Sequence, residues 1–226
     1  MRLIEARRVK KAKNLWWNQL TVITYPTPKI KNTQDIQARL QFSEALQHVT
    51  NRIHAAHNID EIMLDLGQNI CDLFHADRIT IYTLNPEKTH LISKIKLGLT
   101  AFKELKIKIS ASSIAGYVAL HKTLANIHDV YSDAELRSYS PEMHFLQEID
   151  KRTGYRTKQM LVAPICSDLN QELIGVIQII NHLDNTPFSQ QQMDGMQALA
   201  KTMAIAFRLR QQAQIFSGGS SKFDTL

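Results

Sequence analysis

The chain has 226 residues, of which 44% are hydrophobic, and a formal net charge of +6. This length suits one domain of about 150 residues with extensions. Two cysteines, Cys71 and Cys166, stand far apart without a CxxC spacing, which excludes a disulfide framework and a cysteine zinc site and is typical of a reducing compartment. The sequence contains neither an apolar run of about 18 residues nor a secretory signal, so we expect a cytoplasmic protein without a transmembrane segment.

The positive charge is concentrated at the start of the chain. The first 33 residues carry eight basic side chains against Glu5 alone, a net charge of +7, so the remainder sums to −1. A nearly neutral globular part lacks the electrostatic footprint of a nucleic-acid-binding protein. We expect residues 1–33 to form a basic, poorly ordered arm whose removal hardly changes stability, or one that contacts a membrane surface or a partner through Trp16 and Trp17.

Helical periodicity follows the arm. Apolar residues recur at alternating spacings of four and three from Gln34 onward, and residues 58–61 read as a capping box before a second helix that ends near Phe74. A last helix is predicted to begin near Ser189, with a linker-like tail over 217–226. The apolar stripes of the first and last helices, 42–56 and 193–207, have a spacing near 3.5, which predicts a homodimer with a parallel helical seam.

The middle of the chain alternates with period two, which is typical of strands. Strands are expected at 79–84, 90–97, 105–109, 124–127, 159–165 and 173–180. A short helix from a Ser112 cap to Leu120 and a long polar loop over 128–158 interrupt them, and such a long loop is typical of a lid or binding element. The order of elements predicts an α+β fold with one antiparallel sheet, in a domain that spans 34–216.

Four segments in this order resemble the GAF family: SIAGYVA at 113–119, NIHDVY at 126–131, DKRTGYRTK at 150–158 and LIGVIQ at 173–178. The resemblance implies a GAF fold, in which N- and C-terminal helices cover one face of a central antiparallel sheet and a pocket helix and loop cover the other. The sequence is most similar to the GAF domains of cyclic-nucleotide phosphodiesterases and adenylyl cyclases, and to those at the N-terminus of type II and type IV secretion and pilus-assembly ATPases. The phosphate loop GxxxxGK[ST] of such ATPases is absent from the sequence.

The resemblance also implies a set of ligand-binding residues. The backbone N–H groups of two residues at a helix start would hold a cyclic phosphate, and a helix N-terminus is a favourable anion site. Polar side chains of the sheet and the lid would contact ribose and base. The implied residues are Thr80, Ile114, Ala115, Asp150, Thr153, Thr157 and Gln178, the last in place of a glutamate.

Several positions depart from the family pattern. Lys96 and Leu97 stand where relatives carry an aromatic residue and a carboxylate that reads guanine, so an adenine-type cyclic nucleotide is expected to bind better than a guanine one. A further signature, Asn-Lys followed by Phe and an aspartate, appears as residues 181–182 (NH), Phe188 and Gln192. The ion pair that holds the fold in relatives is therefore missing.

The sequence favours a non-catalytic sensor that binds a small ligand and signals to an effector, because it contains no GxSxG, no HExxH and no paired carboxylates. A GAF sulfoxide reductase would need a set of pocket cysteines, which this chain does not supply. A bilin photoreceptor would need a cysteine in the loop 128–158, which contains none, so no cofactor is expected. His54, His57 and Glu61 share a helical face that we interpret as solvated rather than metal-binding. Two alternatives remain open: an empty GAF domain used for dimerisation, and part of a secretion ATPase.

Overall fold

The computed structural model describes residues 33–56, 66–96 and 105–219. Nearly all of the predicted basic arm, the capping box at 58–61 and Leu97 lie outside these ranges. The described residues from Ala38 onward form one compact unit, and α2 begins at Thr33. Across the described ranges, no helix has the length and the hydropathy needed to cross a membrane.

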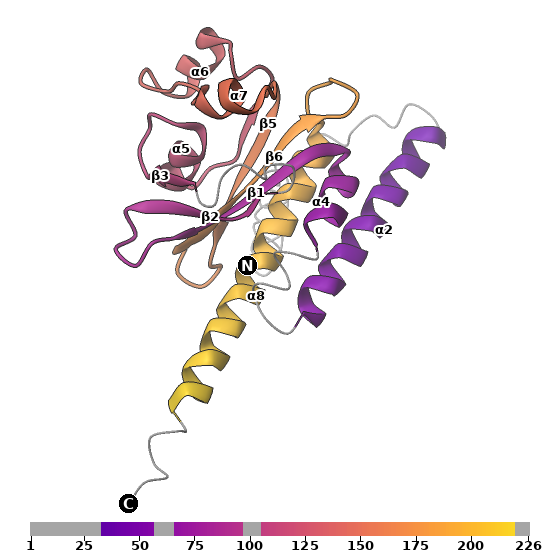
Figure 1. Ribbon diagram of the computed structural model, residues 1–226. Helices are drawn as coiled ribbons and strands as arrows, with labels where there is room; N and C mark the ends of the chain where they lie inside the picture. The colour runs from indigo at the N-terminus through magenta and orange to yellow at the C-terminus, as the bar shows by residue number, and fades with distance from the viewer. Residues whose placement is uncertain (1–32, 57–65, 97–104, 220–226) are drawn as a thin grey trace, which may run out of the picture. The chain divides into compact units, whose positions relative to one another are not determined.

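Helices and strands follow the order that the sequence periodicity predicts, except for two short helices inside the stretch 128–158 that was expected to be a long loop (Figure 1). In chain order they are α2 (Thr33–Ala55), α4 (Gly67–Phe74), β1 (Ala76–Leu84), β2 (His90–Lys96), β3 (Lys106–Lys108), α5 (Ile114–His121), β4 (Ala125–Ile127), α6 (Asp133–Tyr139), α7 (Glu148–Thr153), β5 (Met160–Cys166), β6 (Leu173–His182) and α8 (Gln190–Gly219). Several boundaries differ from expectation, among them the start of β1, three residues earlier than predicted, and the end of β6, two residues later. The side chain that caps α5 belongs to Ser113 and not to Ser112, and α8 extends to Gly219, into the stretch predicted as a tail.

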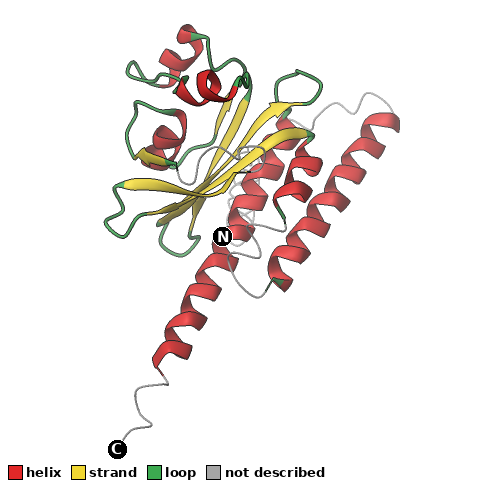
Figure 2. Cartoon of the chain, viewed as in Figure 1, coloured by secondary structure: helices red, strands yellow, loops and turns green. Residues whose placement is uncertain are grey.

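The strands form one six-stranded sheet in the order β3-β2-β1-β6-β5-β4, and each neighbouring pair is antiparallel. The α+β plan with one antiparallel sheet is therefore confirmed. In Figure 2, helices α2, α4 and α8 lie on one side of the sheet, and α5, α6 and α7 lie on the other.

Each face of the sheet carries its own core because successive residues of a strand point to opposite sides. On β1, Ile79 and Ile81 are fully buried with the residues of α2, α4 and α8, whereas Tyr82 belongs to a second core beneath α5 and the loops. Burying a side chain of this size contributes about 1.5–3 kcal/mol. Two such layers fix the strand register, because a slip by one residue would exchange the two faces.

The apolar stripes of α2 and α8 are buried inside this unit, which corrects the predicted dimer seam. Val49 and Ile53 of α2 and Met196 and Met203 of α8 are all at most 3% exposed in the first core. The core on this side of the sheet takes in more apolar helix surface than the spacing of the stripes implies. A dimer would have to use other residues of these helices.

Helices α2 and α8 lie side by side and run in the same direction. Near their starts, a Cβ on Gly195 would lie only 2.6 Å from Cζ of Phe42, so a glycine is required for the ring to pack there. At the end of α2, the Arg210 side chain donates hydrogen bonds to the backbone oxygens of His54 (2.9 Å) and Ala56 (3.0 Å, from Nε). A guanidinium at a helix C-terminus satisfies orphan carbonyl groups and complements the helix dipole.

Candidate ligand-binding site

The second face of the sheet encloses a cavity of about 240 Å³. Its walls come from β1 and β6, from the start of α5 and from the lid, a name used here for residues 128–158. Ligand pockets for drug-sized molecules usually measure about 300–1,000 Å³, so this cavity suits a small ligand. The lining is mainly apolar, with a few polar groups at defined places.

Three polar side chains form the floor of the cavity. Thr80 of β1 lies opposite Gln178 of β6 in the antiparallel ladder, and both are at least 94% buried. Burial raises the pKa of Tyr82 far above its ordinary value, and the Thr80 and Gln178 side chains partly oppose this shift. Tyr82 therefore stays protonated, and the floor combines donors and acceptors without a formal charge.

The start of α5 points backbone N–H groups at the same space. Ser113 caps the helix by accepting a hydrogen bond from the N–H of Gly116. The N–H groups of Ile114 and Ala115, which also line the cavity, have no acceptor among the described residues. Such free N–H groups and the helix dipole favour an anion or a carbonyl oxygen.

Gly116 sets the position of this helix start. A Cβ at Gly116 would lie 2.6 Å from the backbone oxygen of Lys108 and 2.7 Å from that of Ser110. The chain between β3 and α5 can pass this close to the helix only because the side chain is missing. The glycine of the 113–119 motif therefore has a packing role.

Asp150 organises the lid. Its carboxylate is 5% exposed and accepts hydrogen bonds from the Thr157 backbone N–H and hydroxyl and from the Tyr131 hydroxyl, at 2.8–2.9 Å. Burial and this bond to Asp150 raise the pKa of Tyr131. A buried carboxylate with three donors is well satisfied, and it holds α7 against the chain that leads into β5.

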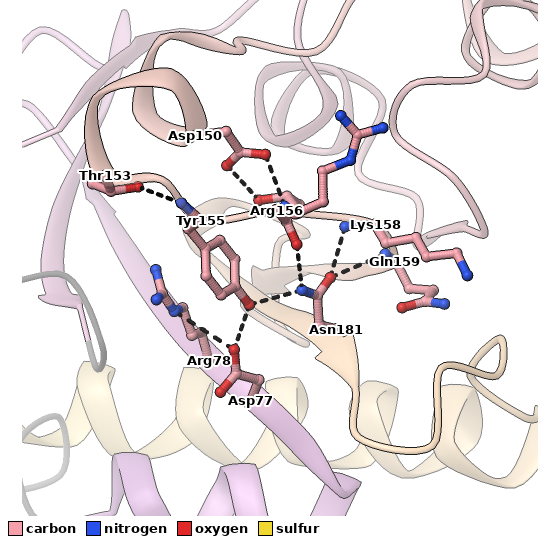
Figure 3. A network of polar contacts seen from close by, with 10 residues as sticks. Asp77, Arg78, Asp150, Thr153, Tyr155, Arg156, Lys158, Gln159 and Asn181 are labelled. Carbon is pink, nitrogen blue, oxygen red and sulfur yellow. Dashed lines mark hydrogen bonds and ion pairs between the residues drawn. The ribbon is translucent and has the colours of Figure 1, made fainter.

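A second network fastens the end of the lid to the sheet (Figure 3). The Asn181 side chain accepts from the backbone N–H groups of Lys158 and Gln159 and donates to the backbone oxygen of Arg156 and the hydroxyl of Tyr155. The Tyr155 hydroxyl donates to Asp77, and burial and this hydrogen bond raise the pKa of Tyr155. The Arg78 guanidinium stacks 3.3 Å from the centre of the Tyr155 ring.

Six of the seven predicted ligand residues line this one cavity: Thr80, Ile114, Ala115, Asp150, Thr157 and Gln178. Thr153 does not line it. Its hydroxyl donates to the Ile149 carbonyl and accepts from the Tyr155 N–H, so it completes the end of α7. A threonine at the end of a helix commonly makes such local bonds, and the sequence pattern alone does not separate the two roles.

Sequence reasoning missed Arg78, Tyr82 and Tyr155, which also line the cavity. For the first two a signal exists, because period two places residues 78, 80 and 82 on the same face of β1. No sequence signal pairs Tyr155 with Arg78, since they come from distant parts of the chain. The side chain of Lys96, like Leu97, is outside the described part.

Two residues that depart from the family signature, His182 and Gln192, make contacts of their own within the fold. Gln192 accepts from the N–H and hydroxyl of Ser189 and donates to the Phe74 backbone oxygen at 2.8 Å, forming a capping box for α8. The His182 ring packs edge-on against His75 and Phe188. The cap and the aromatic cluster stand where the sequence resemblance implies an ion pair in relatives. Within the described ranges, no group of His, Cys, Asp or Glu is arranged to hold a metal ion.

Comparison with known proteins identifies the family. The GAF domain model matches residues 58–207, so this chain belongs to the GAF family. It is 31% identical over 163 residues to the cGMP-specific 3',5'-cyclic phosphodiesterases of Drosophila melanogaster and Drosophila pseudoobscura pseudoobscura. The match takes in 67% of this chain and 13% of each phosphodiesterase, so the chain spans only a small part of these relatives.

Solved structures share the fold at low sequence identity. The GAF domain of a Coxiella burnetii phosphoenolpyruvate-protein phosphotransferase superimposes with a TM-score of 0.65 at 17% identity, covering 78% of this chain and 98% of that one. The free methionine-R-sulfoxide reductase of Neisseria meningitidis gives 0.61 at 14% identity, with 78% and 93% coverage. These similarities establish the GAF fold, which the sequence predicted.

Proposed function

We propose that this domain is a non-catalytic sensor that binds a small molecule, with a cyclic nucleotide as the first candidate, in the cavity between the sheet, α5 and the lid. The observation that carries the proposal is the convergence of free backbone N–H groups at Ile114 and Ala115 with the polar floor of Thr80, Tyr82 and Gln178. A mainly apolar cavity with a few convergent polar groups is the usual form of a small-molecule site.

Membership of the GAF family supports a sensory role. Relatives at 31% identity are named as cGMP-specific phosphodiesterases, which makes cyclic nucleotides the first ligands to test. An adenine-type nucleotide remains our sequence-based preference, because Leu97 replaces the guanine-reading carboxylate.

The cavity offers no nucleophile for the chemistry of the reductase that shares the fold. The described residues that line it include no cysteine. Cys71 lies in the core on the other face of the sheet, where burial raises its pKa to about 12. Burial also raises the pKa of Cys166. Thiols held protonated and away from the cavity are poor nucleophiles, which favours binding over redox catalysis.

Signal output is proposed to pass through α8, which packs directly on β5 and β6 of the sheet that forms the cavity floor, and through α2, which packs beside α8. A homodimer and a cytoplasmic effector, such as a phosphodiesterase or a secretion ATPase, belong to this proposal.

Isothermal titration calorimetry with cyclic AMP and cyclic GMP tests the ligand, together with native mass spectrometry of the purified protein for a co-purifying small molecule. We expect a one-to-one complex with a small molecule. Absence of heat with both nucleotides and of any bound mass would leave the domain as an empty dimerisation module.

A further inference from the structure

The cavity wall holds a guanidinium whose terminal amino groups are unused. Arg78 lies on β1 two residues before Thr80, on the face that lines the cavity, and its side chain is 16% exposed. Its recorded contacts are the stack on Tyr155 and a 3.7 Å approach of Nε to Asp77. With the described residues, its terminal amino groups form no hydrogen bond.

The position of this guanidinium is fixed before any ligand arrives. The Tyr155 ring beneath it is held by the bond of its hydroxyl to Asp77 and by the donor group of Asn181 at 2.8 Å (Figure 3). Stacking on an aromatic face restrains a planar guanidinium while leaving its amino groups available. Asp77 approaches this cation only at Nε, so the terminal amino groups of a mostly buried guanidinium are left for an oxyanion, since burying polar donors without an acceptor is costly.

Nearby carboxylates do not fulfil this role. Asp150 already receives three hydrogen bonds from Thr157 and Tyr131. Glu148 also lines the cavity, but its carboxylate is not among the ion pairs of Arg78. Asp77 approaches Nε beyond hydrogen-bond distance and receives the Tyr155 hydroxyl instead.

We infer that Arg78 is a specificity-determining residue that binds an oxyanion of the ligand, a carboxylate or a phosphate, through its terminal amino groups. This inference rests on the proposed small-molecule function of the same cavity. The rigid fork of arginine matches both groups in a bidentate manner. The ligand class is therefore a small organic acid or phosphate ester with an apolar body.

Arg156 provides a matched control. Its guanidinium stacks 3.4 Å from the centre of the Tyr131 ring, in the same lid, but does not line the cavity. The variants Arg78→Gln and Arg156→Gln thus each remove one arginine–tyrosine stack, and only the first removes a cavity donor. Arg78→Lys keeps the charge and loses the fork.

The experiment measures binding to the full chain by calorimetry and thermal shift. The phosphate probes are cyclic AMP, cyclic GMP and orthophosphate, the carboxylate probes are benzoate and succinate, and adenosine and guanosine are uncharged controls. At least one anionic probe should bind wild type and Arg156→Gln alike and bind Arg78→Gln about ten- to a hundredfold more weakly, with Arg78→Lys between. The probe that binds tells phosphate from carboxylate.

Three results would overturn the inference. These are equal affinity of wild type and Arg78→Gln for an anionic probe, nucleosides binding as tightly as their cyclic phosphates, and no anionic probe binding wild type at millimolar concentration. The first two results would leave the proposed small-molecule function intact. After the third result, a small molecule bound in the native mass spectrum would show that the small-molecule function holds and that only the role of Arg78 is wrong. The thermal midpoints of the unliganded variants show whether Arg78→Gln is folded, and Arg78→Lys gives the comparison if it is not.

Discussion

Thr157 donates both its backbone N–H and its side-chain hydroxyl to the carboxylate of Asp150, at 2.8 Å each. Asp150→Ala would leave these donors and the Tyr131 hydroxyl without their acceptor. Since a hydrogen bond to a charged group contributes about 1.5–3 kcal/mol, we expect the free energy of unfolding to fall by at least about 2 kcal/mol. Urea denaturation measures it. Asp133→Ala, which removes an exposed ion pair with Arg137, should change little, and equal effects of the two substitutions would contradict this role.

Asp150→Ala also bears on ligand binding. If the lid must be ordered to close the cavity, the variant should bind any ligand of the wild type about tenfold more weakly or worse. An unchanged dissociation constant, measured by calorimetry on folded protein, would remove Asp150 from the site.

Gly116→Ala gives a test in which two effects have opposite signs. Inside a helix this change normally stabilises by about 0.5–1 kcal/mol. Here the new Cβ would meet two backbone oxygens at 2.6–2.7 Å, and such overpacking costs about 1–3 kcal/mol. We expect a net loss of stability in urea denaturation together with weaker ligand binding, because the α5 start would shift. A gain in stability would contradict this expectation and would show that the chain between β3 and α5 can move away from the new Cβ at little cost.

His182 should make stability depend on pH. Burial lowers its pKa, partly opposed by Asp184, with His75 acting in the same direction as burial. Its Nδ1 faces the Asp184 N–H and the Thr186 hydroxyl, which favours the neutral ring. The unfolded chain therefore takes up the proton first, and the stabilisation present above about pH 6.5 is lost as the pH falls below that value.

Thermal midpoints of wild type and His182→Phe between pH 8 and pH 5 measure this effect. The phenylalanine keeps the edge-on packing with Phe188 and does not titrate, so its pH dependence should be weaker. Parallel curves for the two proteins would rule out His182 as the source.

Dimerisation is tested at the exposed apolar residues of the flanking helices. Leu40 of α2 and Ile205 and Leu209 of α8 are 58%, 38% and 45% exposed. If they form the contact between two copies, Leu209→Glu should convert a dimer at tens of micromolar into a monomer in sedimentation equilibrium, without lowering the thermal midpoint. Leu169→Glu, at the 80% exposed tip of the β5–β6 turn, is the control. A wild-type monomer would contradict the prediction.

The strands could be predicted from sequence because period two is a local property. Alternation alone places Thr80 and Tyr82 on one face of β1 and Ile79 and Ile81 on the other. The α5 cap was misplaced by one residue, because Ser112 and Ser113 are adjacent and both suit an N-cap.

The relationships that complete the cavity are not local. Arg78 meets Tyr155 only because β1 and the lid converge, and Thr153 turns its hydroxyl to its own helix although the family pattern points it to the ligand. The apolar stripes of α2 and α8 have a coiled-coil spacing, yet they are buried in the core on one face of the sheet. Periodicity shows which face of a helix is buried and not what buries it.

The four hydrogen bonds of Asn181 have a mechanical consequence. They attach residues 155–159 to the end of β6, whereas residues 144–146 are held by one backbone hydrogen bond, from the His144 N–H to the Ser112 oxygen, and by the contact of the Phe145 ring with Tyr131. Leu146 is 44% exposed although it lines the cavity. We expect the lid to open at this less firmly held part, with a hinge near Gly154, the glycine at φ +68° that ends α7. A molecule would thus enter past Leu146 and travel inward toward the sheet.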